Sequence, residues 1–311
     1  MPVVLAVDVG GTKLAVGLVD QEGRVLESRR RPTPRAADAE AIWLELWSMV
    51  EEVAAGVDVA GVGIGCGGPM LWPSGVVSPL NMPAWRDFPL RARFQERYVG
   101  RPVRLFNDAI CLAIAEHWRG VGRGHDNVLG MVVSTGVGGG LVLGGRVVEG
   151  TTGNAGHIGH VVVDPSGPVC GCGGRGHVES YARGPVIAQW ATEQGWLPPH
   201  RPATAQDVAT DATRGHPVAT EALRRAGHAI GVAVASAVHL MDLDVVAVGG
   251  GVAQAGSLLF EPLDAALRSQ ARMDFARRVQ VVPTSLGQAA GLVGAAALVV
   301  AGDSYWPPGD S

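Results

Sequence analysis

Lysine is nearly absent from this sequence of 311 residues, because Lys13 is the one lysine among 25 basic residues. The basic residues stand against 29 acidic ones, which gives a formal net charge of -4. A chain with this balance has no field that attracts nucleic acid or an anionic membrane surface. We therefore expect no nucleic-acid partner and no membrane partner.

Cysteines and long apolar runs are also scarce. The chain has 4 cysteines, and its longest apolar run, 289–301, falls short of the ~18 residues that would span a bilayer. The first residues, MPVVLAVD, are too short and too soon acidic for a signal peptide. We expect a cytoplasmic protein, and in that reducing compartment no disulfide framework.

Glycine is abundant, with 45 residues beside 20 prolines, but it follows no G-X-Y period. Collagen and helical repeat proteins are therefore excluded, and the glycines are expected in turns. The length predicts about two domains of ~150 residues. The hydrophobic share of 47% is enough for two cores.

Two similar hairpins predict how these domains are built. The first joins two β-type runs across Gly10–Lys13, and the second joins two across Thr135–Gly139. Such a repeat after about 120 residues favours a duplicated α/β fold, with two domains and a central cleft that would hold the ligand. We expect an N-terminal domain over 1–120, a C-terminal domain over 121–301 and a loose tail over 302–311.

Periodicity and punctuation predict further elements. The glycine-rich segment 120–126 is the candidate hinge. A helix over 289–301 is apolar nearly all round, so it should be buried, between the domains or packed back on the N-terminal one. Strands are expected over 59–64, 103–106 and 245–248, and helices over 38–55, 109–118, 205–213 and 218–241.

The hairpin turns carry the first chemical signal. Backbone N–H groups of Gly10 and Gly11 and the Thr12 hydroxyl can approach phosphate oxygens, while Lys13 adds a positive charge. Asp8 ends the preceding strand, where it can organise Mg²⁺ through water. A tight turn alone would explain one such pattern. The sequence repeats it at Thr135 and Gly136 and adds a turn suited to adenosine at Gly249, Gly250 and Gly251, so we predict nucleotide binding.

Other nucleotide motifs are missing. Lys13 lacks the G-x-x-x-x-G lead of a Walker A loop. The two G-x-G-x-x-G matches, at 63–68 and 171–176, do not open a helix, which excludes a Rossmann site.

Asp108 is the second signal, because it follows a strand and opens a helix. Asn107 or Asp108 can serve simply as the helix cap. The Asp108 carboxylate can also accept the proton of a substrate hydroxyl that attacks a γ-phosphate. Both roles are compatible.

A glycine-rich segment over 151–177 carries the third signal. Two thiols and two imidazoles, from Cys170, Cys172, His160 and His177, have the donor types of a tetrahedral Zn²⁺ site. Such an ion would order a loop that has no core of its own. The alternative is a reduced loop without metal.

These motifs together resemble the ROK family of repressors, open reading frames and sugar kinases, and its bacterial glucokinase branch most of all. The resemblance rests on DVGGTK at 8–13, STGVGGG at 134–140, GNAGHIGHVVVDPSGPVCGCGGRGHVE at 153–179 and VGGG at 248–251, and it extends from Leu5 to about Ala301. It implies an actin-like ATPase (ribonuclease H-like) fold and ATP-dependent phosphorylation of a hexose at its 6-hydroxyl.

The resemblance also implies residue roles. Asp108 would be the catalytic base, and the structural zinc ligands would be His160, Cys170, Cys172 and His177. Family members are commonly dimers or tetramers, so a homodimer or homotetramer is expected. The sugar would be held by Asn107, Glu179, His160 and His157, with Gly67, Gly68 and Asn81 closing over its other face.

This sequence departs from the family pattern at two positions. His157 stands where the family usually has Glu, and a neutral imidazole supplies one acceptor in place of a carboxylate's several lone pairs. The preferred sugar is therefore open between glucose and an N-acylhexosamine or other hexose. His177 stands where a third Cys is usual and remains a competent zinc ligand.

Three alternatives to an ATP-dependent glucokinase stay open. A sugar-sensing repressor would carry a DNA-binding helix-turn-helix before the kinase-like part, and Asp8 already lies in the phosphate turn, which disfavours it. A non-catalytic sugar-binding relative and an enzyme that uses polyphosphate as donor are the other two.

Overall fold

The computed structural model describes residues 2–34 and 38–306. The chain divides into two compact units. Unit 1 comprises Met1–Asp126, Gly140–Gly156 and Ser285–Ser311, and unit 2 comprises Asn127–Gly139 and His157–Thr284. No helix among the described residues is long and apolar enough to cross a membrane.

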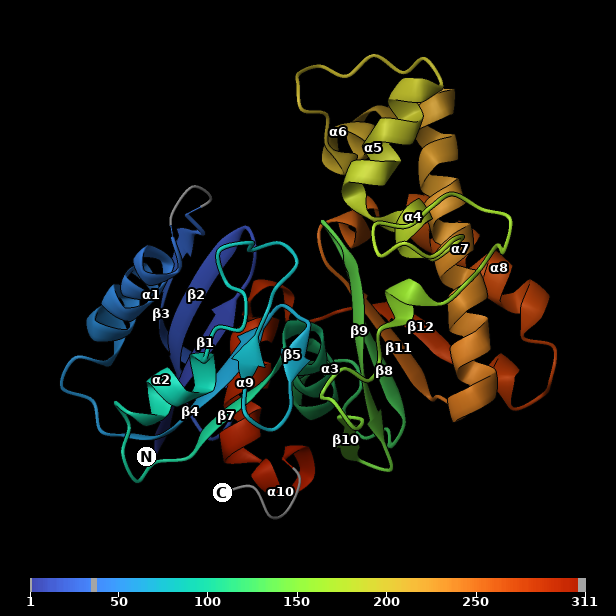
Figure 1. The fold of residues 1–311 in the computed structure, drawn as a ribbon. Helices are drawn as coiled ribbons and strands as arrows, with labels where there is room; N and C mark the ends of the chain where they lie inside the picture. The colour runs from blue at the N-terminus through green and yellow to red at the C-terminus, as the bar shows by residue number, and fades with distance from the viewer. Residues whose placement is uncertain (1, 35–37, 307–311) are drawn as a thin grey trace. The chain divides into compact units, whose positions relative to one another are not determined.

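A five-stranded sheet with the order β3-β2-β1-β4-β7 forms the centre of unit 1 (Figure 1). β1 pairs antiparallel with β2 and parallel with β4, and β4 pairs parallel with β7. Its strands are β1 (Val3–Val9), β2 (Lys13–Val19), β3 (Val25–Pro32), β4 (Val59–Cys66) and β7 (Val103–Asn107).

The two faces of this sheet are covered differently because side chains alternate along each strand. Leu5 and Val7 join an apolar cluster with helix α1 (Ala39–Ala54), which runs beside β3 in Figure 1. The opposite face carries small residues. A Cβ on Gly63 would lie 1.8 Å from the carbonyl oxygen of Ala295 in helix α9 (Ala290–Val300), so only glycine allows this helix so close.

The apolar helix α9 is buried within unit 1, against β1, β4 and helix α3 (Asp108–Arg119). This packing explains why α9 is apolar on all sides, since it has the sheet on one side and a helix on the other. The remaining elements of unit 1 are β5 (Met70–Leu71), β6 (Val76–Val77), α2 (Leu90–Gln95), β10 (Arg146–Val148), η4 (Gly287–Ala289) and α10 (Gly302–Tyr305).

The second five-stranded sheet has the order β10-β9-β8-β11-β12 and repeats the pattern of the first. β10 pairs antiparallel with β9, and β11 pairs parallel with both β8 and β12. The duplicated α/β fold predicted from the two hairpins is confirmed by this repeated order. The strands are β8 (Val128–Val133), β9 (Val137–Leu143), β11 (Val245–Gly249) and β12 (Gln280–Pro283).

Helices account for most of the rest of unit 2. The long helix α7 (Pro217–Met241) packs along α8 (Ser257–Gln270), as Figure 1 shows. The others are η1 (Ile158–His160), α4 (Glu179–Ala182), α5 (Gly184–Glu193), α6 (Ala205–Thr213), η2 (Val252–Ala255) and η3 (Ala276–Arg278).

The division between the units differs from the expected boundary at 120/121, because it falls after Asp126 and two later segments return to unit 1. One of these, 140–156, is tied there by a hydrogen bond from the N–H of Gly145 to the carbonyl of Asp126 (3.0 Å). The other, 285–311, carries α9 into the core of unit 1.

The expectation of a loose tail from Gly302 is corrected by the structure. Gly302–Tyr305 form α10, and Tyr305 and Trp306 are 3% and 4% exposed. Two large aromatic side chains gain enough from burial to order a short segment whose glycine and prolines predict a loop. The rest of the expected tail, 307–311, lies outside the described residues.

Candidate active site

The parallel strands β1, β4 and β7 of unit 1 end side by side. The candidate site lies at this edge of the sheet. Val9 in β1 pairs with Cys66 in β4, and Cys66 pairs with Asn107 in β7. Asp8 and Asp108 therefore lie at one edge of the sheet. Open α/β sheets bind their ligands outside the carboxyl ends of parallel strands.

The protonation of both Asp8 and Asp108 is shifted by their surroundings. Burial, together with the negative charge of Asp8, raises the pKa of Asp108 from its ordinary value of 3.8 to about 6. Burial likewise raises the pKa of Asp8, against the lowering effect of Lys13 and Arg30. A carboxyl group with a pKa near 6 is ionised at neutral pH and still basic enough to take a proton in a reaction.

The turn after β1 holds its shape through backbone hydrogen bonds. The N–H of Gly10 donates to the carbonyl of Lys13 (2.9 Å), and the Thr33 hydroxyl donates to the carbonyl of Gly10 (2.6 Å). Lys13 Nζ donates to Gln288 Oε1 (3.2 Å). The phosphate-type turn at Gly10–Lys13 thus presents its ammonium group beside a polar side chain from the segment that leads into α9.

The residues predicted to close over a sugar lie next to this edge. A Cβ on Gly68 would lie 2.8 Å from Asn107 Nδ2, and one on Gly11 would lie 2.4 Å from Asn81 Cβ. Asn107 is the N-cap of α3, because its Oδ1 accepts from the N–H of Ala109 (3.0 Å). Its Nδ2 group is directed toward Gly68. The cap role and a ligand-binding role therefore use different atoms of Asn107.

Asn154 also belongs to this part of unit 1, although its role was not predicted. Its Nδ2 donates to the carbonyl of Met70 (3.0 Å), and the N–H of Met70 donates to its Oδ1 (3.3 Å). The Asn154 side chain thus bonds both backbone groups of Met70 in β5, as a residue of a neighbouring strand would. Asn154 lies inside the GNAGH motif, so its position in that motif was the available signal.

Unit 2 brings the second set of predicted nucleotide residues together. The N–H of Ser134 donates to the carbonyl of Gly136 (2.8 Å) across the turn that contains Thr135. Gly250 has φ +94° and lies so close to β8 that a Cβ would be 2.3 Å from the carbonyl oxygen of Val133. The Gly249–Gly251 turn and the Thr135–Gly136 turn are therefore neighbours.

Glu179, the first residue of helix α4, is hydrogen-bonded to the residue that follows the Thr135–Gly136 turn. Its Oε2 accepts from the N–H of Val137 (2.9 Å). The rings of His157 and His160 lie nearly parallel with centroids 6.1 Å apart, and His157 is exposed. Burial lowers the pKa of His160, while the charge of Glu179 raises it.

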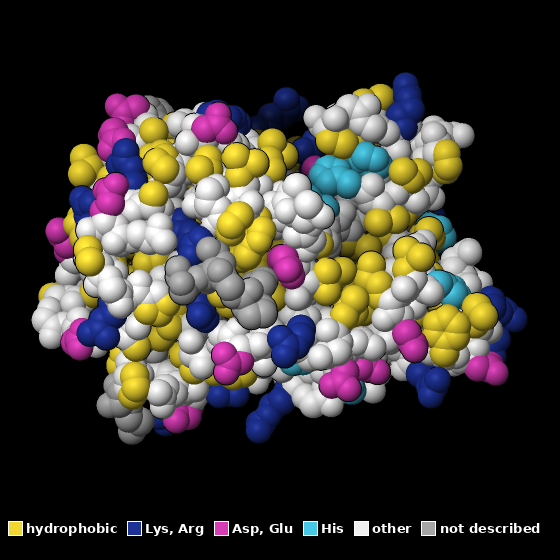
Figure 2. Space-filling view, turned by 60° about the horizontal axis from the view of Figure 1, so that its bottom comes forward, with side chains coloured by type: hydrophobic (Ala, Val, Ile, Leu, Met, Phe, Trp, Pro, Cys, Tyr) yellow, Lys and Arg dark blue, Asp and Glu magenta, His cyan; other side chains and the backbone are white. Residues whose placement is uncertain are grey.

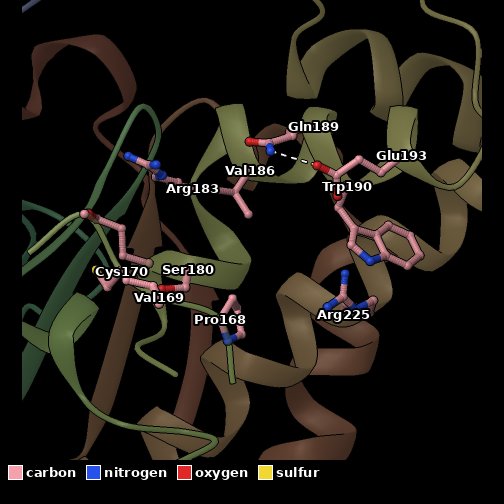
Figure 3. Close-up of a pocket in the computed structure, with 12 residues that line it drawn as sticks. Pro168, Val169, Cys170, Ser180, Arg183, Val186, Gln189, Trp190, Glu193 and Arg225 are labelled. Carbon is pink, nitrogen blue, oxygen red and sulfur yellow. Dashed lines mark hydrogen bonds between the residues drawn. The ribbon is translucent and has the colours of Figure 1, made fainter. Parts of the chain in front are cut away.

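A pocket of about 340 Å³ opens beside Glu179 in unit 2. Helices α4, α5 and α7 and the segment Pro168–Gly171 form its walls (Figure 3). Gln189 donates to Glu193 (2.8 Å), and the guanidinium of Arg225 lies 4.2 Å from the Trp190 ring centroid. These contacts fix part of the pocket wall formed by α5 and α7.

Four donor atoms of the glycine-rich segment cluster in unit 2. Those of His160, Cys170, Cys172 and His177 all lie within 4.8 Å of one another. The Nδ1 atoms of the two histidines are 3.3 Å apart, and Cys172 Sγ is 3.3 Å from His177 Nδ1. Tetrahedral geometry with Zn–N of about 2.0–2.1 Å places two nitrogens about 3.3 Å apart. The arrangement therefore fits a zinc ion.

The sequence of this protein matches a known protein family over nearly its whole length. The family model described as "ROK family" matches residues 4–301. The chain belongs to the ROK family. This ROK protein is 34% identical to a glucokinase of Thermotoga maritima over 308 residues, which cover 95% of this chain and 96% of that protein. It is 36% identical to an N-acetylmannosamine kinase of Yersinia pestis over 298 residues, covering 94% and 96%.

A solved structure agrees with these sequence matches. The ROK glucokinase of Streptomyces griseus, determined in complex with glucose and AMPPNP, superposes with a TM-score of 0.82 at 34% identity and covers 95% of this chain and 98% of that one. Both the predicted family and the predicted actin-like ATPase fold are confirmed.

Glu116 is a further residue of this ROK protein that sequence reasoning missed. It is 0% exposed, and its carboxylate accepts from the backbone N–H groups of Val121 (3.0 Å), Ser285 (3.1 Å) and Leu286 (3.1 Å). These residues belong to the two connections that leave and re-enter unit 1 at Asp126 and Ser285. An acidic residue in an apolar helix was the available signal.

Proposed function

We propose that this protein transfers the γ-phosphoryl group of ATP to the 6-hydroxyl of a hexose, with glucose as the preferred acceptor. The observation that carries the proposal is Asp108, the first residue of α3 directly after β7, whose carboxyl group has a pKa of about 6 in the field of Asp8 and Lys13. The glucokinases that match over nearly the full length support the same reaction.

Asp108 is the general base of this reaction. The substrate oxygen attacks the γ-phosphorus, the bond between that phosphorus and the bridging oxygen breaks, and ADP leaves. The hydroxyl proton passes to the Asp108 carboxylate. Because phosphoryl transfer needs positioning and charge stabilisation more than covalent chemistry, a base and fixed phosphate contacts suffice.

The nucleotide is held by two groups of residues. In unit 1, Gly11 and Thr12 offer backbone and hydroxyl donors to phosphate, and Lys13 offers an ammonium group. Gly10 keeps the turn in shape, because its N–H donates to the carbonyl of Lys13. Asp8 fits a Mg²⁺ ion held through water, because a carboxylate is a preferred ligand type. In unit 2 the corresponding residues are Thr135, Gly136, Gly249, Gly250 and Gly251.

The sugar is held by amide, imidazole and carboxylate groups. Asn107 and Asn81 come from unit 1, where Gly68 leaves room beside the Asn107 amide. Glu179, His157 and His160 come from unit 2. Since His157 replaces the usual Glu, a kinase for an N-acylhexosamine is the second candidate, which the 36% identity to an N-acetylmannosamine kinase favours.

The cluster of His160, Cys170, Cys172 and His177 is proposed to hold a structural Zn²⁺ ion. Its support is the fit of the donor separations to tetrahedral geometry. The ion would fix the segment between His157 and Glu179, which has little regular structure of its own. In that way it would position His160 and Glu179 for the sugar.

The charged side chains on the surface bear on the partners of the protein. On the face in Figure 2, Lys and Arg side chains alternate with Asp and Glu side chains, and neither sign forms a continuous patch there. Such a face does not fit nucleic acid. We propose a cytoplasmic enzyme, without a nucleic-acid or membrane partner, that forms a homodimer or homotetramer.

A phosphoryl-transfer assay over a panel of hexoses and amino sugars, with ATP and polyphosphate as donors, tests this function. We expect ATP with glucose to give the highest kcat/KM. Highest activity with an N-acylhexosamine would show that this sugar, and not glucose, is the preferred acceptor. Highest activity with polyphosphate would show that polyphosphate, and not ATP, is the phosphoryl donor. If the protein binds a sugar but no combination of sugar and donor gives a phosphorylated product, the protein is a non-catalytic sugar-binding relative.

A further inference from the structure

Three aromatic rings of unit 1 form a cluster in which Phe106 and Trp306 are buried and Trp72 is half-buried. The Trp306 ring centroid lies 4.7 Å from that of Trp72 and 5.2 Å from that of Phe106. Trp72 and Phe106 stack with centroids 4.8 Å apart and planes 12° apart. Every ring therefore touches the other two, which we call the aromatic triangle.

Two members of the aromatic triangle are directly connected to the candidate sugar site. Phe106 is 0% exposed and immediately precedes Asn107 and Asp108 in the chain. Trp72 follows β5 in the segment that runs from Gly68 to Asn81. The third member, Trp306, belongs to neither of these segments.

Charged side chains fix Trp306 in this place. The guanidinium groups of Arg91 and Arg104 lie 5.3 and 5.5 Å from its ring centroid. Arg91 Nη1 also donates to the carbonyl of Pro73 (2.7 Å), and Arg104 Nη1 donates to the carbonyl of Leu298 in α9 (2.6 Å). The same two cations thus hold Trp306, the segment after Trp72 and the end of α9.

The neighbouring Tyr305 attaches the same segment to α3. A hydrogen bond of 2.5 Å joins its hydroxyl to His117 Nδ1. Since α3 begins at Asp108, Tyr305 and Trp306 together contact both the helix that starts at Asp108 and the segment that carries Gly68. Asn154 holds the other side of that segment through Met70.

We propose that Trp306 is a positioning residue for the sugar. It acts through Trp72 and Phe106, whose segments carry Gly68, Asn81 and Asn107, and it keeps these groups at a fixed distance from each other. Without the Trp306 ring, the 68–81 segment loses one wall of its support while the nucleotide turn at Gly10–Lys13 keeps its own hydrogen bonds. The inference rests on the proposed hexose kinase function.

The test compares Trp306→Leu with Trp306→Phe in the full chain, using initial rates with glucose and ATP varied separately. Because two aromatic pairs that support the sugar-binding segments are lost, we expect the KM for glucose to rise by about tenfold. The KM for ATP should stay within about twofold, because the Gly10–Lys13 turn is untouched. Trp306→Phe should restore most of the glucose KM.

A matched control separates positioning from general destabilisation. Trp196 is 1% exposed in unit 2 and donates through Nε1 to Asp211 (2.9 Å). Trp196→Leu should lower Tm by a similar amount and leave the ratio of the two KM values unchanged. Equal effects of Trp306→Leu and Trp196→Leu on that ratio would overturn the inference.

Two further outcomes are decisive. If Trp306→Leu does not fold, Trp72→Leu removes the same contact from the half-buried side, and an unchanged glucose KM in that variant overturns the inference. If the unaltered protein phosphorylates no hexose, the proposed function itself fails. An active enzyme whose variants keep the normal glucose KM contradicts only the role of Trp306.

Discussion

Replacing the proposed base by its neutral amide, Asp108→Asn, should abolish most activity and stabilise the fold at neutral pH. The amide has the shape of the carboxyl group, and its oxygen can still accept from the N–H of Ala109, which lies 2.8 Å from Asp108 Oδ1. The negative charge is lost, and so is the ability to take a proton.

The size of the stability change follows from the pKa of Asp108. Burial and the charge of Asp8 raise it from 3.8 to about 6, so the folded protein binds this proton more tightly than the unfolded chain does. The contribution to folding is fully present below about pH 4 and is lost as the pH rises through 6. The loss amounts to at most about 3 kcal/mol at pH 8, since Asp108 is partly open to solvent.

Urea unfolding at pH 4 and pH 8 measures this difference. Asp108→Asn should exceed the unaltered protein in free energy of unfolding by up to about 3 kcal/mol at pH 8 and by less than about 1 kcal/mol at pH 4. Activity provides the second readout, because loss of a general base lowers kcat by about 10²–10⁴-fold. In the unaltered enzyme kcat/KM should rise with pH through about 6.

Asp58, an exposed carboxylate of unit 1, provides the matched control. Asp58 is paired with Arg101 on the surface, with its side chain 86% exposed. Asp58→Asn should change the free energy of unfolding by less than about 1 kcal/mol and leave kcat unchanged. An Asp108→Asn variant that is less stable at pH 8, or that keeps more than about a tenth of kcat, would refute the argument from buried charge.

Three other substitutions test separate parts of the account. Cys172→Ser removes one proposed zinc ligand, so the purified variant should contain less zinc per chain by atomic absorption and melt at a lower temperature, whereas equal zinc content would exclude the site. Lys13→Arg replaces a compact ammonium by a planar fork and should raise the KM for ATP, and an unchanged KM would make this lysine incidental. Glu116→Leu leaves the N–H groups of Ser285 and Leu286 without their carboxylate acceptor, so urea unfolding should show a loss of about 1–3 kcal/mol, and a loss below about 1 kcal/mol would argue against an anchoring role.

Local patterns in the sequence predict much of the fold. The helix predicted over 205–213 is observed as Ala205–Thr213, where Thr204 and Asp207 form a capping box. Asn107 caps α3 in the way that its residue type and position indicate. Both hairpins form, because alternation and glycine turns act over short distances.

Elements that depend on distant partners were missed. Strand β3 reads VLESRRRP and has no apolar alternation, yet it pairs with β2 at the sheet edge, where charged side chains face water. Helix α8 contains Pro262 and forms because α7 packs along it. Trp306 looked like part of a tail because its partners, Trp72 and Phe106, are far away in the sequence.

The residues of the candidate site also fall into those that local sequence patterns predict and those that they do not. Asp8, Asp108 and the turn at Gly10–Lys13 are predictable because each sits at the end of a strand, and strand ends can be read from the sequence. Asn154 and Gln288 are not, since each acts on a residue far away in the chain, Met70 and Lys13. No short-range pattern indicates such pairs.

The most direct test of the central claim is to measure the product and the binding of glucose for the unaltered protein and for Asp108→Ala in parallel. With ATP and Mg²⁺, the unaltered protein should form ADP and glucose 6-phosphate in equal amounts. Asp108→Ala should form neither, while calorimetry shows glucose binding of nearly normal affinity. Substantial glucose 6-phosphate formation by Asp108→Ala would contradict the role of this carboxylate as the base.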